Sequence, residues 1–157
     1  MGIVPLILYG ILIAAAAIED AMRLKISNLT NVLILVVGLG TLLLNWNPEW
    51  WEHILAFAIA LALGIGMYAL GWFGGGDAKL LGAAAFAFDL GGLPAFLLLT
   101  ALAGGVMAIL FVGTSLFRRQ NKGIRNRSLP YGIAIAAGAM LTFWIYPDNT
   151  VFAGLGR

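Results

Sequence analysis

Two aspartates and a run of glycines are the residues of this chain best suited to chemistry. Asp77 directly follows three glycines and lies between two long apolar runs, and Asp20 ends the first apolar run in a similar setting. An ionisable group at such a place is costly in a membrane protein and is by default a functional-site candidate. Two neighbouring carboxyls can share a proton, so that one activates a water molecule while the other hydrogen-bonds a scissile carbonyl. The pair therefore predicts the chemistry of an aspartic protease, with Asp20 and Asp77 as catalytic residues.

The residues around Asp77 are candidates for substrate binding, and each has a simpler explanation. The substrate-binding candidates are Gly74, Gly75, Gly76 and Lys79. Glycine lets a substrate backbone approach closely, although a glycine run also suits any flexible loop. Lys79 could favour the ionised form of Asp77 or only anchor its helix at the membrane interface. Either aspartate, taken alone, could equally cap a helix or pair with Arg23 or Lys79.

The composition is that of an integral membrane protein. Of the 157 residues, 62% are hydrophobic and 10% are charged, whereas soluble domains have roughly 25% charged residues. The absence of cysteine excludes thiolate nucleophiles and cysteine-based metal sites, and the single histidine, His53, excludes a His-rich metal site. We therefore expect neither a metal nor another cofactor. The net charge of +2 gives no indication of a nucleic-acid partner, and the expected surroundings are a lipid bilayer.

The apolar segments predict an all-α membrane protein with six transmembrane helices in one domain, residues 1–157. The segments are Ile3–Ile18, Leu29–Leu44, Ile54–Phe73, Leu80–Phe88, Leu93–Phe117 and Pro130–Tyr146. A spanning helix needs about 20 residues, and the fourth segment has only nine between Lys79 and Asp89. Either Asp89 lies within the membrane, or the helix starts below the cytoplasmic surface and the glycine run lines a cleft. The turn-like sequence after Asp89 favours the second interpretation.

The basic residues predict the orientation. Eight of the nine lie in alternate loops: Arg23, Lys25, Lys79, Arg118, Arg119, Lys122, Arg125 and Arg127. The positive-inside rule then places both termini outside the cytoplasm and both aspartates on the cytoplasmic side.

Three stretches resemble motifs of one family, the type IV prepilin peptidases, and they occur in the same order. Residues 19–28 are similar to the first aspartate motif, in which an aspartate is followed by a basic residue and then Ile-Pro-Asn. Residues 74–80 resemble the second motif, GxGD, and residues 129–138 resemble the Pro-Tyr-Gly stretch that opens the last helix of short members. Ser27 stands where the family usually has proline, and we expect it to cap the second helix.

This resemblance implies a multi-pass aspartic endopeptidase of the inner (cytoplasmic) membrane. Its substrate would be a prepilin of the Flp type, whose basic leader is removed at the cytoplasmic face. Longer members carry a cysteine-containing portion that accompanies N-methylation; this chain is similar to the short, peptidase-only members, and archaeal preflagellin peptidases share the same minimal frame. The same carboxylates could instead serve a small proton- or cation-coupled transporter or channel, or only hold together a non-catalytic membrane subunit.

Overall fold

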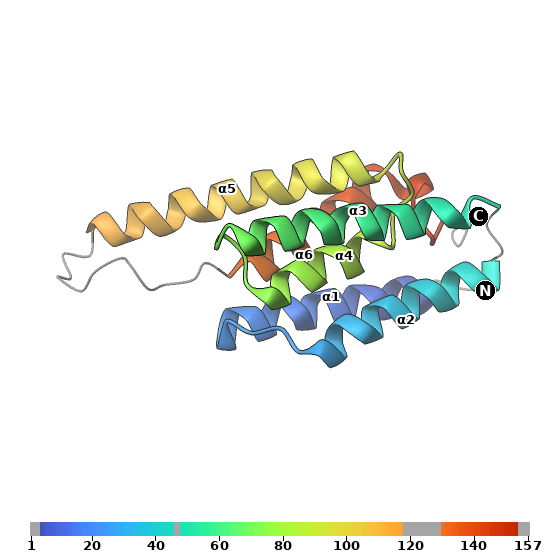
Figure 1. Cartoon of the computed structure of the whole chain (residues 1–157), viewed down its shortest axis with the longest axis horizontal. Helices are drawn as coiled ribbons and strands as arrows, with labels where there is room; N and C mark the ends of the chain where they lie inside the picture. Colours follow the sequence, from blue (N-terminus) through green and yellow to red (C-terminus); the bar gives the residue numbers. More distant parts are fainter. Residues whose placement is uncertain (1–3, 46–47, 118–129, 154–157) are drawn as a thin grey trace.

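The protein is a bundle of helices that run alternately up and down (Figure 1). A computed structural model describes residues 4–45, 48–117 and 130–153. In chain order the helices are α1 (Val4–Arg23), α2 (Asn28–Asn45), α3 (Trp50–Ala69), α4 (Gly75–Ala85), α5 (Leu93–Phe117), α6 (Tyr131–Ile145) and the 3-10 turn η2 (Pro147–Asn149). The basic residues predicted between 118 and 127 lie outside the described residues.

Four helices are long and apolar enough to cross a membrane: α1, α2, α3 and the first 19 residues of α5. α6 is also apolar but has only 15 residues. α4 has 11 residues and rises about 16 Å, roughly half the thickness of the hydrocarbon layer. The prediction of an all-helical, multi-pass membrane protein is confirmed, with six α-helices among the described residues, of which four have membrane-spanning length.

The apolar runs predicted some helix boundaries better than others. α5 has the predicted boundaries, Leu93–Phe117. α1 continues five residues beyond the predicted end and so includes Asp20. α3 begins four residues earlier than predicted and ends four residues earlier, at Ala69, because the chain turns at Gly71 with φ 75°, a left-handed conformation that suits glycine.

α4 is the centre of the bundle. Most of its residues are buried, and it packs against α3, α2 and α6. Its turns carry small residues, so the neighbouring helices approach closely; at Gly64 of α3, an added methyl group would lie 2.9 Å from the backbone of Ala78. On the other side, the Tyr9 hydroxyl of α1 donates a hydrogen bond of 2.9 Å to the carbonyl oxygen of Ala84.

Because α4 ends at Ala85, the chain that follows it occupies the end of the bundle beyond α4 as non-helical backbone. We call the end where α4 and α6 begin the aspartate end, because Asp77 lies there, and the other the opposite end. At the opposite end, the chain after α4 pairs with the chain after η2 through an isolated bridge between Phe88 and Thr150. The N–H of Asp89 donates to the carbonyl of Asn149, and that of Val151 donates to Ala87. Backbone that is not helical is tolerated at membrane depth only where its polar groups are paired in this way.

Asp89 belongs to this closure at the opposite end, at the turn between α4 and α5. Its carboxylate accepts a hydrogen bond of 2.7 Å from the N–H of Gly92 and further bonds from the side chain of Asn149. His53, at the same end of α3, is fully buried. The turn that the sequence predicts after Asp89 is present, but the predicted bounds of the fourth segment, Leu80–Phe88, are wrong: α4 begins at Gly75 and ends at Ala85, four residues before Asp89.

Candidate active site

Asp20 lies near the end of α1, where the start of α6 covers it. Its side chain is only 3% exposed, and its Oδ2 accepts a hydrogen bond of 2.7 Å from the backbone N–H of Gly132. Gly132 is the second residue of α6, so this N–H is one of the four that a helix leaves without a partner in its own backbone. An added methyl group at Gly132 would lie 2.8 Å from Cβ of Asp20, so only glycine fits there.

Asp77 lies in the first turn of α4 and caps that helix. Its side chain is 7% exposed, and its Oδ2 accepts a hydrogen bond of 3.0 Å from the N–H of Gly74, the residue that precedes the helix. The positive end of a helix dipole favours an anion at this position. Each aspartate is therefore held by a backbone N–H at the start of a helix, Asp77 at α4 and Asp20 at α6.

The structure brings the two carboxyls into one neighbourhood. The rings of Phe73 and Tyr131 pack with their centroids 4.7 Å apart, and each ring directly precedes a glycine that binds one of the aspartates. The pKa of the Asp77 carboxyl is raised to about 6, mainly by burial and then by the charge of Asp20, against the opposing effect of the Gly74 N–H. Like-charge repulsion of this kind acts between close groups and disfavours the state in which both carboxyls are ionised.

The loop between α1 and α2 packs against the start of α4, and hydrogen bonds with both of its flanking helices hold it. Ser27 caps α2, as predicted: its Oγ accepts a hydrogen bond of 3.0 Å from the N–H of Thr30. Glu19 accepts hydrogen bonds from the N–H of Ser27 and from the hydroxyl of Thr30, at 2.9 and 3.1 Å. Glu19 thus fixes the loop that follows Asp20, a positioning role that the sequence analysis did not foresee.

The glycine run meets this loop directly. An added methyl group at Gly76 would lie 3.2 Å from both Cβ and N of Ile26, so Gly76 lets the start of α4 pack against the loop. Gly74 and Gly75 are exposed beside Asp77. Lys79 donates a hydrogen bond of 2.9 Å to the side chain of Asn28, which links α4 to the start of α2.

No three His, Cys, Asp or Glu side chains within residues 4–45, 48–117 and 130–153 gather closely enough to hold a metal ion. The chemistry available at the site is that of two buried carboxyls with an exposed glycine backbone beside them. Such a pair can remove a proton from water and donate one to a carbonyl oxygen.

A comparison with known protein families shows the family to which the chain belongs. The model of the type IV leader peptidase family matches residues 6–109, about two thirds of the chain. The chain belongs to the type IV leader peptidase family. The matched residues include both Asp20 and Asp77, so the resemblance that their motifs predicted is confirmed at the level of the family.

Gly132, which binds Asp20 in this leader peptidase, lies beyond the matched residues. The sequence analysis missed its role, although the Pro-Tyr-Gly stretch around it had been noted and was the available signal. A search of curated proteins and a search of solved structures gave no match.

Proposed function

We propose that this leader peptidase is an aspartic endopeptidase in which Asp20 and Asp77 together activate a water molecule. The observation that carries the proposal is the pair of buried carboxyls, each bonded to a backbone N–H at the start of a helix. The raised pKa of Asp77 supports a shared proton near neutral pH.

In the proposed reaction, the ionised carboxyl of the pair takes a proton from a bound water molecule, and the water oxygen attacks the scissile carbonyl carbon. The protonated carboxyl gives its proton to the carbonyl oxygen, which forms a neutral tetrahedral intermediate. When the carbon–nitrogen bond breaks, the carboxyl that took the water proton donates it to the leaving nitrogen. The other carboxylate takes a proton from a hydroxyl of the intermediate, so the pair again holds one proton and the products are a carboxylic acid and an amine. Because the two carboxyls titrate as a unit, the roles belong to the pair.

We propose Flp-type prepilins as the substrates, with cleavage at the cytoplasmic face of the inner membrane. The distribution of basic residues supports an aspartate end that faces the cytoplasm. Exposed Gly74 and Gly75 would leave room for the substrate backbone beside Asp77. We assign no N-methylation to these residues, because the cysteine pairs that accompany it in longer relatives have no counterpart among the 157 residues.

The test is co-expression with a tagged Flp-type prepilin, whose size is followed on a gel. We expect the wild type to remove the leader and Asp20→Asn and Asp77→Asn to lose cleavage by at least about a hundredfold, the lower range for acid–base catalysis. The double variant should be no worse than either single variant, because residues that act as a unit are not additive. Asp148→Asn, which makes the same change at an exposed position of the opposite end, is the matched control.

Cleavage that persists in both aspartate variants, at membrane levels equal to the wild type, would refute the proposed mechanism. Absence of cleavage by the wild type across several Flp-type prepilins would refute the proposed substrate. If those wild-type membranes instead showed proton or cation flux that Asp77→Asn abolishes, the transporter hypothesis would replace the peptidase mechanism.

A further inference from the structure

An apolar groove of about 430 Å³ lies between α3 and α5, with α4 and α6 beneath it. α3 packs mainly on α4, and α5 packs mainly on α6, so the boundary between these two helix pairs is left open. Its α3 wall includes Leu63 and Met67. Its α5 wall carries the small residues Ala101, Gly104, Gly105 and Ala108. Helices in membranes pack most closely where such small residues face a partner.

The groove reaches the candidate active site. Phe73 and Tyr131 form part of its lining, and they are the two rings that pack together, tilted by 40°, beside the glycines that bind Asp77 and Asp20. An extended segment that leaves the groove at these rings would therefore meet the two carboxyls directly.

The length of the groove suits one face of an apolar helix. The α5 wall runs from Leu97 to Ala108, which is about 16 Å along the helix axis and corresponds to about 11 residues of an occupant helix. The resemblance to prepilin peptidases implies a substrate in which the basic leader is followed by an apolar helix, so that this helix begins just after the scissile bond. An occupant of this length would lie in the groove while its amino end meets the aspartates.

We propose that the first turns of the mature pilin's apolar helix bind in this groove and enter it from the lipid between α3 and α5. The inference rests on the proposed function and adds where the part of the substrate that remains after cleavage is held. The groove would thus set the distance between the membrane-embedded helix and the scissile bond, so that the bond just outside the helix is the one presented to the carboxyls.

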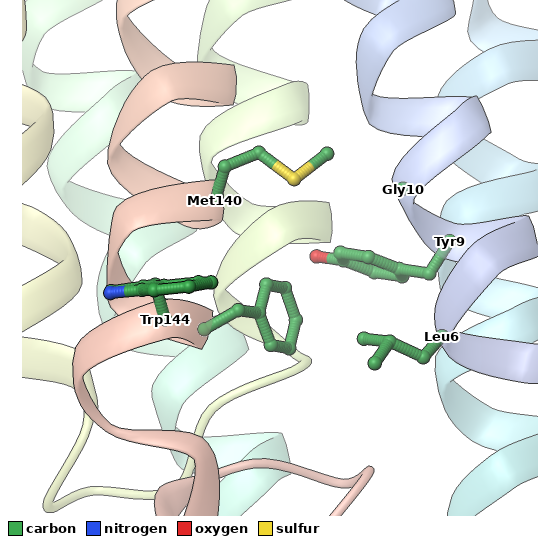
Figure 2. Close-up of a pocket in the computed structure, with 6 residues that line it drawn as sticks. Leu6, Tyr9, Gly10, Met140 and Trp144 are labelled. Carbon is green, nitrogen blue, oxygen red and sulfur yellow. The ribbon is translucent and has the colours of Figure 1, made fainter. Parts of the chain in front are cut away.

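A second apolar pocket of similar character provides the matched control (Figure 2). It measures about 260 Å³ and lies between α1 and α6, where Leu6 and Tyr9 face Met140 and Trp144. Tyr9 is 11 residues before Asp20 in the same helix, about 16 Å along its axis. A substituent added here is remote from the carboxyls.

The first arm of the test fills each pocket with the same side chain. At Gly105 nothing lies within 4 Å of an added methyl group, and at Gly10 the nearest atom is the flexible end of Met140, at 3.5 Å. We expect Gly105→Leu to slow cleavage of a full-length Flp-type prepilin by at least about tenfold, because the added side chain takes space that the substrate helix needs and the bound helix would be overpacked. Gly10→Leu should cleave at the wild-type rate.

The second experiment detects the substrate in the groove by cross-linking. It tests whether the pilin helix binds there even if Gly105→Leu fails to accumulate in the membrane. The chain has no cysteine, so Ala101→Cys or Leu102→Cys gives a single thiol, in the groove wall or on the neighbouring, 57% exposed face of α5. Each is combined with Asp77→Asn and with a prepilin that carries one cysteine in the first turns of its mature helix. We expect a disulfide with the prepilin from Ala101→Cys and none from Leu102→Cys.

If Gly105→Leu cleaves at the wild-type rate, or if both positions cross-link equally, the inference that the pilin helix binds in the groove is wrong, and the peptidase proposal stands. If neither position cross-links, the inference is also wrong, and lipid is the occupant of the groove. If the wild type cleaves no prepilin, the proposed function and the groove inference fall together.

Discussion

The contact between Gly132 and Asp20 gives the sharpest prediction of this structure. Gly132→Ala adds one methyl group, which in the present geometry would lie 2.8 Å from Cβ and 2.9 Å from Oδ2 of Asp20. Real side chains do not approach so closely, so either the carboxyl of Asp20 or the start of α6 must move. In both cases the hydrogen bond of 2.7 Å from the Gly132 N–H to Asp20 is lengthened or lost.

The size of the effect follows from that bond. A hydrogen bond to a charged group contributes about 1.5–3 kcal/mol. If the whole contribution is lost from the reactive arrangement, cleavage slows by about tenfold to a hundredfold, since each 1.36 kcal/mol is tenfold in rate. Gly40→Ala, on α2, is the matched control, because an added methyl group there meets nothing within 4 Å.

The assay is the rate of prepilin processing in membranes that contain equal amounts of each variant, with thermal unfolding of the purified proteins in detergent as a check of folding. We expect slow processing by Gly132→Ala and wild-type processing by Gly40→Ala. Wild-type processing by Gly132→Ala would show that the position of Asp20 does not depend on α6, and the reasoning about this site would be wrong.

Three further predictions concern stability. The pKa of Asp77 is raised from 3.8 to about 6 in the folded protein, so the free energy of unfolding of the wild type should be highest below pH 4 and fall by about 3 kcal/mol as the pH rises through 6. Asp77→Asn should remove this loss. A wild-type unfolding temperature that stays constant from pH 4 to 8 would contradict the prediction. Tyr9→Phe removes the hydrogen bond to Ala84 and should lower the free energy of unfolding by about 1 kcal/mol in denaturant titrations, with the cleavage rate unchanged. Loss of cleavage at wild-type stability would instead show that the Tyr9 hydroxyl acts in the reaction. Ser27→Ala removes the hydrogen bond from the Thr30 N–H that caps α2, and should lower the free energy of unfolding by about 1 kcal/mol in the same titration. Ser27→Thr is the conservative control. Equal unfolding curves for Ser27→Ala and the wild type would exclude the cap as a source of stability.

The sequence predicted those parts of the fold that depend on local composition. The 25 residues of α5 and the glycine run at the start of α4 are recognisable because each signal is continuous along the chain. The predicted end of α1, Ile18, is five residues too early, because the prediction ended the helix at the last apolar residue before the charged Glu19 and Asp20. In the folded protein, the Glu19 carboxylate bonds the next loop and Asp20 is covered by α6, so the helix continues through both.

The candidate site was predicted from sequence only in part, for a related reason. Asp20 and Asp77 stand out because a carboxylate is rare in an apolar chain. Their partners are backbone N–H groups, which every residue but proline carries, so no residue type marks them. Gly132 binds Asp20 across 112 positions of sequence, and only the packing of α6 against α1 decides which N–H arrives there.

The alternating course of the six helices has a practical consequence. The described chain starts at Val4 and finishes at Ala153, and both lie at the end of the bundle away from the aspartates (Figure 1). A purification tag or fluorescent protein fused to either terminus would therefore stand at the opposite end of the bundle from the two aspartates. Such a fusion leaves the approach of the leader unobstructed, which allows the enzyme to be labelled and followed while it works.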